Sequence, residues 1–197
     1  ENYRAPPARR DWLPEFFVWR RPFPVPERVA RRHRKHIADF DELGFQITPD
    51  LTLAEAHDVF FDTLSIAPAV LAEVDRFTSS SFEGRVLGIH YRGTDKVLEA
   101  EPVGYHEMTA HAAELIEVGE IDTVFVASDE AQFVAFVEES FPHVRVVSRD
   151  DHERSSDGRA IHQDRAAGSP IGLDALCNAL LLSRCDTLLR TTSFLSA

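Results

Sequence analysis

The regular alternation of apolar runs and helical segments over the second half of the chain constrains the fold most. Four apolar runs predict strands, at 85–91, 122–128, 143–148 and 186–191. Segments that predict helices lie between them, at 105–118, 130–140 and 171–185. Strands that alternate with helices form a parallel sheet covered by helices on both faces. We therefore expect an α/β protein with a Rossmann-like parallel sheet.

Polar side chains gather where three of these strands end. The first strand runs into His90–Lys96, "HYRGTDK", which contains one of only two lysines in the chain. Ser128–Asp129 and Thr191–Ser193 follow two of the other strands. Ligands of parallel sheets bind beyond the carboxyl ends of the strands. We therefore expect these three clusters to converge on one edge of the sheet and to mark an active site.

The cluster after the first strand contains the side chains best suited to hold a phosphate. Arg92 can make a two-pronged contact with a phosphate, and Gly93 lets the backbone approach closely. His90 can hydrogen-bond a base or a sugar, while Asp95 and Lys96 can position a substrate. A charged turn closed by an internal Arg–Asp pair is the competing interpretation. Because the chain has no glycine-rich phosphate motif, both the phosphate-binding interpretation and the charged-turn interpretation stay open.

The other polar residues near strand ends each have a structural alternative. Asp129 either caps the next helix or faces a ligand. Asp174 lies in an otherwise apolar helix, where its carboxylate either gains from the helix dipole or contacts a nucleotide base. Thr192 and Ser193 either hold a phosphate or close a turn.

The N-terminal region is predicted to be mostly helical. Its predicted helices lie at 26–40, from Thr52 onward and at 68–74, after an irregular stretch over 1–26. The sequence "TLAE", which begins at Thr52, is a capping box, and 78–84 is predicted as a loop. We therefore expect two parts, an N-terminal region over 1–80 and the Rossmann-like domain over 81–197.

Charge and composition exclude several classes of protein. The net charge is −12, and because residues 1–36 carry +6, the remainder carries −18. So acidic a body argues against nucleic-acid binding. No apolar run approaches the roughly 18–20 residues of a membrane-spanning helix, so we expect no transmembrane segment.

The cysteines and histidines match no metal pattern. Cys177 and Cys185 are eight residues apart, which fits neither a zinc site nor a redox CxxC motif. We interpret them as buried thiols of a protein from a reducing compartment, and we expect the cytoplasm. The nine histidines show no metal-binding spacing, so no metal site is expected.

Three segments resemble the motifs of a known enzyme superfamily. They are "GRVLGIHYRGTDKV", "VFVASDEAQFVAFVEESFP" and "GLDALCNALLLSRCDTLLRTTSFLSA". In this order they resemble the first, second and third motifs of the fucosyltransferase superfamily, which includes core α-1,6-, nodulation and protein O-fucosyltransferases. The resemblance covers residues 82–197 and implies a GT-B fold with two Rossmann-like domains, of which this chain would hold the C-terminal one and part of the acceptor side.

The resemblance also implies a donor and its contacts. The donor would be GDP-fucose, bound without a metal ion, with Arg92 on the β-phosphate. His90 and Asp174 would hold the guanosine, and Thr192 and Ser193 the diphosphate. The acceptor would be a glycan or a protein.

Further residues are implied around the sugar. Asp95 and Lys96 would shape the sugar pocket, with Tyr105 and Asp129 nearby. Glu99 matches the family glutamate after the "TDK" segment and would be the base, with Glu101 as the alternative.

The expected function is inverting, metal-independent transfer of fucose from GDP-fucose to an acceptor hydroxyl. A non-catalytic nucleotide-sugar-binding protein, or a glycosyltransferase with another donor, are the alternatives. The chain departs from the α-1,6 branch at Gly93, which replaces a second arginine. Its N-terminal 80 residues are few for a full acceptor domain, and nothing follows the strand of the third motif, so we expect a fragment that is truncated at the C-terminus.

Overall fold

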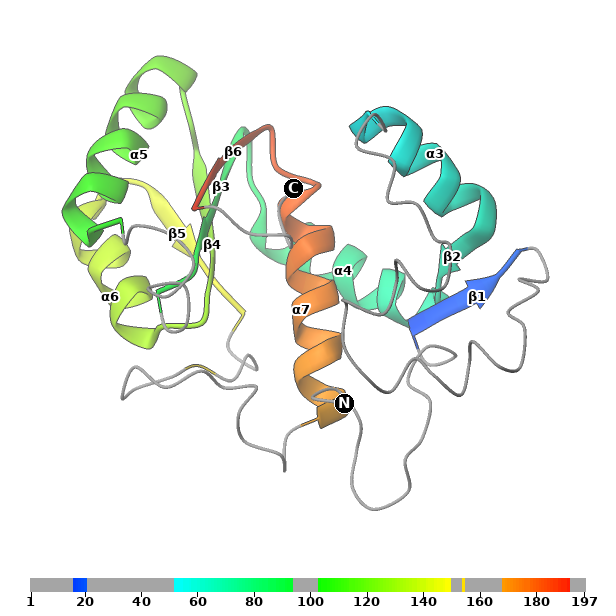
Figure 1. Ribbon diagram of the computed structural model, residues 1–197. Helices are drawn as coiled ribbons and strands as arrows, with labels where there is room; N and C mark the ends of the chain where they lie inside the picture. The colour runs from blue at the N-terminus through cyan, green and yellow to red at the C-terminus, as the bar shows by residue number, and fades with distance from the viewer. Residues whose placement is uncertain (1–15, 21–51, 94–102, 150–153, 155–167, 192–197) are drawn as a thin grey trace, which may run out of the picture. The chain divides into compact units, whose positions relative to one another are not determined.

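A computed structural model describes residues 16–20, 52–93, 103–149, 154 and 168–191. Contacts divide these residues into two compact units, the first ending at Pro68 and the second beginning at Ala69 (Figure 1). The domain boundary that we expect near residue 80 remains a prediction. The predicted helix at 26–40 lies outside the described residues.

The first unit contains a short antiparallel strand pair and one helix. Strand β1 (Phe17–Trp19) pairs with β2 (Leu64–Ile66), which directly follows helix α3 (Leu53–Thr63). The predicted capping box is confirmed: the Thr52 hydroxyl accepts from the Glu55 backbone N–H, and the Glu55 carboxylate accepts from the Thr52 N–H. The prediction that residues 1–26 are irregular is wrong for β1. A three-residue strand has no readable alternation, and its partner is almost fifty residues away.

The second unit is a four-stranded parallel sheet with helices on both faces. The strands are β3 (Val86–Tyr91), β4 (Thr123–Ser128), β5 (Arg145–Val147) and β6 (Thr187–Arg190), in the order β5-β4-β3-β6. The helices are α4 (Pro68–Ser81), α5 (Tyr105–Gly119), α6 (Ala131–Ser140) and α7 (Gly168–Leu182). The α/β fold and its parallel sheet are confirmed.

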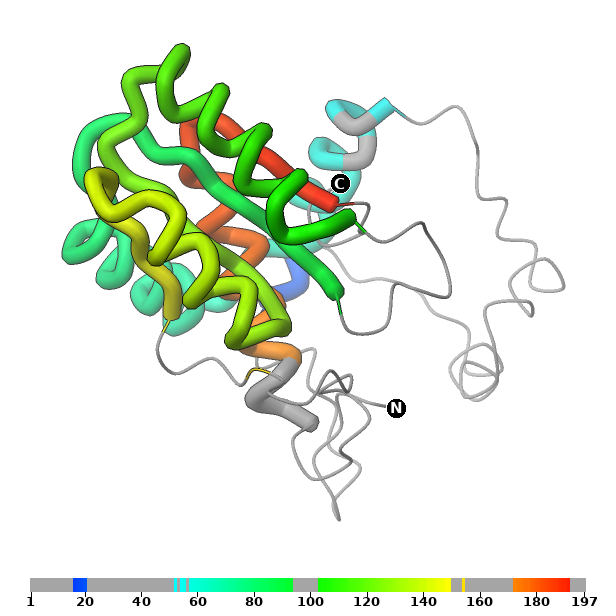
Figure 2. Tube along the Cα trace, turned by 90° about the vertical axis from the view of Figure 1, so that its left-hand side faces the viewer, coloured from blue at the N-terminus to red at the C-terminus, as the bar shows by residue number. Residues whose placement is uncertain are grey.

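Alternate residues of the two central strands face opposite layers of helices. Every residue of β3 and β4 is buried, as expected for strands covered on both faces. Ile89 and Val126 belong to the core with α5 and α6, whereas Gly88 approaches Cys185 and Leu182 at the end of α7. Figure 1 shows α5 and α6 on one side of the sheet and α7 on the other, and Figure 2 views the sheet from the side of α5 and α6.

Helix α4 is longer than the sequence indicated. It continues to Ser81, so the loop predicted over 78–84 begins four residues later than expected. The Thr78 and Ser80 hydroxyls donate to the carbonyls of Asp75 and Phe77, three residues earlier in the helix. In this hydroxyl-rich segment, which composition marks as a loop, the side chains thus hydrogen-bond within a helix.

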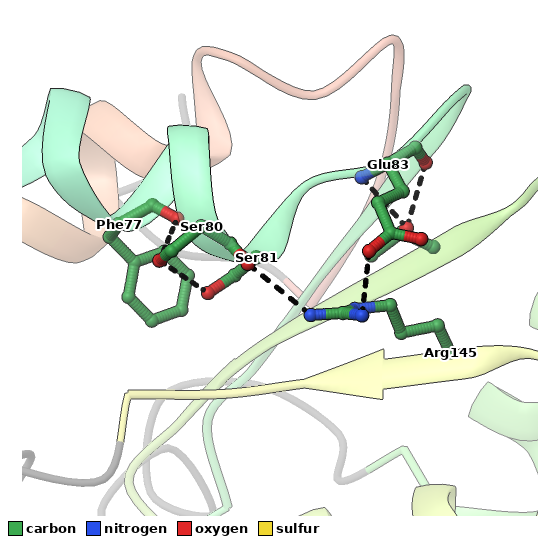
Figure 3. A network of polar contacts seen from close by, with 6 residues as sticks. Phe77, Ser80, Ser81, Glu83 and Arg145 are labelled. Carbon is green, nitrogen blue, oxygen red and sulfur yellow. Dashed lines mark hydrogen bonds and ion pairs between the residues drawn. The ribbon is translucent and has the colours of Figure 1, made fainter.

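The connection from α4 to β3 is fixed at the amino edge of the sheet (Figure 3). Arg145 donates to the Glu83 carboxylate at 2.7 Å and to the Ser80 carbonyl at 3.4 Å. The Thr123 hydroxyl donates to the Glu83 carbonyl at 2.8 Å. These contacts lie at the edge opposite the polar clusters, so they support the sheet without forming part of the candidate site.

Candidate active site at the carboxyl edge of the sheet

The strand register brings the three predicted clusters together. In the sheet, Tyr91 pairs with Ser128, and His90 pairs with Arg190 on the other side. The residues that follow these strands therefore emerge side by side at one edge. The predicted convergence is confirmed for the described residues Arg92, Asp129 and Thr191, since Arg92 contacts both of the others.

The turn at Arg92 and Gly93 is held from both neighbouring strands. The Arg92 N–H donates to the Thr191 hydroxyl at 3.2 Å, and the Gly93 N–H donates to Asp129 Oδ1 at 3.3 Å. Asp129 Oδ2 also lies 3.8 Å from Arg92 Nε. Arg92 is thus in an ion pair, although with an aspartate that follows the neighbouring strand and not with one inside the turn, and its side chain keeps 29% of its surface exposed.

Asp129 does not cap helix α6. The residue at the cap position is Glu130, which makes no side-chain capping bond, and its N–H donates instead to the Ser128 hydroxyl at 3.1 Å. Of the two roles weighed for Asp129, the helix cap is therefore wrong. Its carboxylate contacts the turn after β3 instead.

Glu130 is a site residue that the sequence analysis missed. Its carboxylate accepts a 2.6 Å hydrogen bond from the Tyr105 hydroxyl at the start of α5. A Cβ atom at position 93 would lie 2.5 Å from Glu130 Oε1, so the carboxylate fills the space that a side chain at Gly93 would need. Burial and then the bond to Glu130 raise the pKa of Tyr105. A glutamate that begins a helix carries no sequence signal for this contact.

His90 is neutral at physiological pH. Its side chain lies on the α7 face of the sheet and is only 2% exposed. The pKa of His90 is lowered from 6.5 to about 4, mainly by burial and to a smaller extent by the nearby charges of Arg92 and Arg190. A neutral imidazole has one donor and one acceptor nitrogen, so it can hydrogen-bond a base or a sugar without adding charge.

Asp174 forms a buried ion pair with Arg149. Its Oδ1 lies 3.5 Å from Arg149 Nη2, and the two side chains are 10% and 4% exposed. Because α7 begins at Gly168, Asp174 lies beyond the first turn, and stabilisation by the helix dipole does not explain it. Arg149 was missed, although it follows β5 and the strand-end rule that selected Arg92 also points to it.

The remaining predicted residues lie outside the described part of the chain. They are Asp95, Lys96, Glu99, Glu101, Thr192 and Ser193. The described residues contain no group of three side chains able to hold a metal ion. Within the same residues, no helix has the length and apolar character needed to cross a membrane.

Comparison with known proteins gives matches among solved structures. No protein-family model and no curated protein matches the sequence. The structure of NodZ alpha-1,6-fucosyltransferase soaked with GDP-fucose aligns with a TM-score of 0.52 and 22% identity, over 74% of this chain and 45% of that one. NodZ co-crystallised with GDP gives a TM-score of 0.51 at the same identity and coverage.

POFUT1 in complex with GDP-fucose is a more distant neighbour, with a TM-score of 0.44 and 10% identity over 64% of this chain and 39% of that one. The chain therefore spans less than half the length of the solved structures that it matches. The likeness to NodZ concerns the fold, which in this chain is a parallel sheet in the order β5-β4-β3-β6. The chain thus shares the α/β fold of the NodZ structures, and the fold predicted from the sequence is confirmed.

Proposed function

We propose that the chain binds GDP-fucose at the carboxyl edge of the sheet and transfers fucose to a hydroxyl of a glycan or protein acceptor. The observation that carries this proposal is the placement of Arg92. Its side chain is 29% exposed at the edge where ligands of parallel sheets bind, in a turn anchored to both neighbouring strands. The NodZ structures, which share the fold, were obtained with GDP-fucose and with GDP.

The proposed chemistry assigns stabilisation of the leaving group to the protein. Cleavage of the sugar–phosphate bond leaves negative charge on GDP and builds positive charge on the sugar. A fixed guanidinium at Arg92, with Thr192 and Ser193 on the diphosphate, would stabilise the departing GDP without a metal ion. His90 and Asp174 would hold the guanosine.

An inverting displacement also needs an acceptor hydroxyl aimed at the anomeric carbon and a base to take its proton. Glu99 is the proposed base and Glu101 the alternative. Asp95 and Lys96 would shape the sugar pocket, with Tyr105 beside it.

Calorimetry tests the donor assignment. We expect heat with GDP and GDP-fucose, none with UDP, and no effect of a chelator. Arg92→Ala should weaken GDP binding and abolish transfer, whereas Arg76→Ala, which changes a 71% exposed arginine on α4, should alter neither. Wild-type GDP affinity and turnover in Arg92→Ala would refute the proposal.

Two further measurements separate the alternatives. A non-catalytic binding protein would bind GDP-fucose but show no turnover, whereas an enzyme should lose turnover in either Glu99→Gln or Glu101→Gln. Stronger binding of GDP-mannose than of GDP-fucose would indicate another donor.

A cytoplasmic location is also part of the proposal. It is supported by the two cysteines, Cys177 and Cys185, which are thiols and do not form a disulfide.

A further inference from the structure

The carboxylate of Asp129 is directed to the neighbouring strand. Residues 92 and 129 follow β3 and β4, and the pairing of Tyr91 with Ser128 places them side by side. Asp129 Oδ1 accepts from the Gly93 N–H at 3.3 Å, and Oδ2 lies 3.8 Å from Arg92 Nε. One side chain thus contacts both the backbone and the guanidinium of the turn.

These contacts restrict where the guanidinium can lie. The group is planar, so a carboxylate beside its Nε edge restricts rotation of the whole plane. The bond to the Gly93 N–H holds the backbone from which Arg92 projects. The Asp129 side chain is 18% exposed, less than that of Arg92, so this contact is partly shielded from water.

Electrostatics argues against direct contact between Asp129 and the donor. A diphosphate is an anion, and a carboxylate beside it would repel it. The same carboxylate favours binding only if the order that it imposes on Arg92 outweighs this repulsion.

We propose that Asp129 is a positioning residue, which orients Arg92 and the Gly93 backbone for the diphosphate and does not itself contact the donor. This inference rests on the proposed function, because it takes Arg92 as the group that grips the diphosphate. It replaces the expectation that Asp129 contributes directly to donor binding.

A double-mutant cycle tests the inference with GDP affinity as the readout. Asp129→Asn keeps the shape of the side chain and an oxygen for the Gly93 N–H, but it removes the charge facing Arg92. We expect GDP to bind about tenfold more weakly, which lies in the range of coupling energies between residues in contact. In the Arg92→Ala background, the same change should alter the affinity less than twofold, because it acts through Arg92.

The outcomes separate this inference from the proposed function. Unchanged GDP affinity in Arg92→Ala would refute the function itself. The positioning role is overturned if Arg92→Ala weakens GDP binding while Asp129→Asn does not. It is also overturned if the fold-loss in GDP affinity of the double variant equals the product of the two single losses, which is the result that a general structural role would give. Tighter binding in Asp129→Asn would show that repulsion dominates, which also overturns it.

Two further variants complete the test. Asp75→Asn, at a 61% exposed carboxylate on α4, should leave GDP affinity unchanged. If Asp129→Asn does not fold, Asp129→Glu replaces it in the same cycle. Its longer side chain misplaces the charge, and its loss should likewise disappear in the Arg92→Ala background.

Discussion

Asp174 Oδ1 lies 3.5 Å from Arg149 Nη2, and both side chains are almost completely removed from solvent. The pair connects helix α7 to the end of β5, the element that precedes α7 in the described part of the chain. Burying two charges is costly unless each compensates the other. The pair therefore holds the side chain of Asp174 in place beside the end of β5.

Removing one member of this pair should destabilise the fold strongly. Arg149→Met leaves the Asp174 carboxylate buried without its cation, and we expect a loss of about 3 kcal/mol or more in the free energy of unfolding. Arg149→Met combined with Asp174→Leu should cost less than Arg149→Met alone, because no buried charge remains. Urea denaturation measures all three proteins.

The exposed pair of Arg184 and Asp75 provides the matched control. Its side chains are 52% and 61% exposed, so Arg184→Ala should change the free energy of unfolding by no more than about 1 kcal/mol. Equal losses in Arg149→Met and Arg184→Ala would contradict the stabilising role assigned to the buried pair.

Gly93 and Glu130 should be energetically coupled. In Gly93→Ala the new methyl group would meet the Glu130 carboxylate, which must then move and break its bond to Tyr105. We expect the free energy of unfolding to fall by about 1–3 kcal/mol, as in other overpacked sites. In a Glu130→Ala background the same substitution should cost much less. Urea denaturation of the wild type, the two single variants and the double variant measures the coupling energy between positions 93 and 130. If Gly93→Ala lowers the free energy of unfolding equally with and without Glu130, the steric explanation is ruled out.

The convergence of Arg92, Asp129 and Thr191 could be predicted because it depends only on strand order. In a parallel sheet, all carboxyl ends share one edge, so finding the strands is sufficient to bring together the residues that follow them. Long buried strands such as β3 and β4 are recognisable from their apolar runs alone.

The partners of these residues could not be predicted in the same way. Whether Asp129 caps its own helix or contacts Arg92 depends on side-chain direction, which strand order does not specify. The Glu130–Tyr105 bond joins residues 25 positions apart, and the Glu130 carboxylate in that bond fills the space that a side chain at position 93 would need. Strand β1 was missed because three residues provide too little pattern.

Burial of His90 should make stability depend on pH in a defined window. The unfolded chain protonates this histidine near pH 6.5, but the folded protein does so only near its lowered pKa of about 4. Stability from this group is therefore fully present above pH 6.5 and decreases as the pH falls towards 4. The full difference corresponds to roughly 3 kcal/mol.

The test compares the wild type with His90→Gln by urea denaturation at pH 7 and pH 5. Stability of the wild type should fall more between these values than that of the variant. His111→Gln changes a 59% exposed side chain on α5, and its free energy of unfolding should decrease between pH 7 and pH 5 as much as that of the wild type. The same fall in wild type and His90→Gln would show that His90 does not titrate as described.

The thiol of Cys185 should be unreactive in the folded protein. Burial, followed by the charge of Asp186, raises its pKa from 9.0 to about 12, and the thiol donates to the Leu181 carbonyl at 3.4 Å. Only the thiolate reacts with disulfide reagents, and its fraction at pH 8 falls about a thousandfold for such a shift. Ellman's reagent should therefore label neither Cys185 nor the buried Cys177 rapidly until urea unfolds the chain, when both should react. Rapid labelling of the native wild type that disappears in Cys185→Ser would contradict this protection, because it would place an accessible thiolate at the end of α7 beside Gly88.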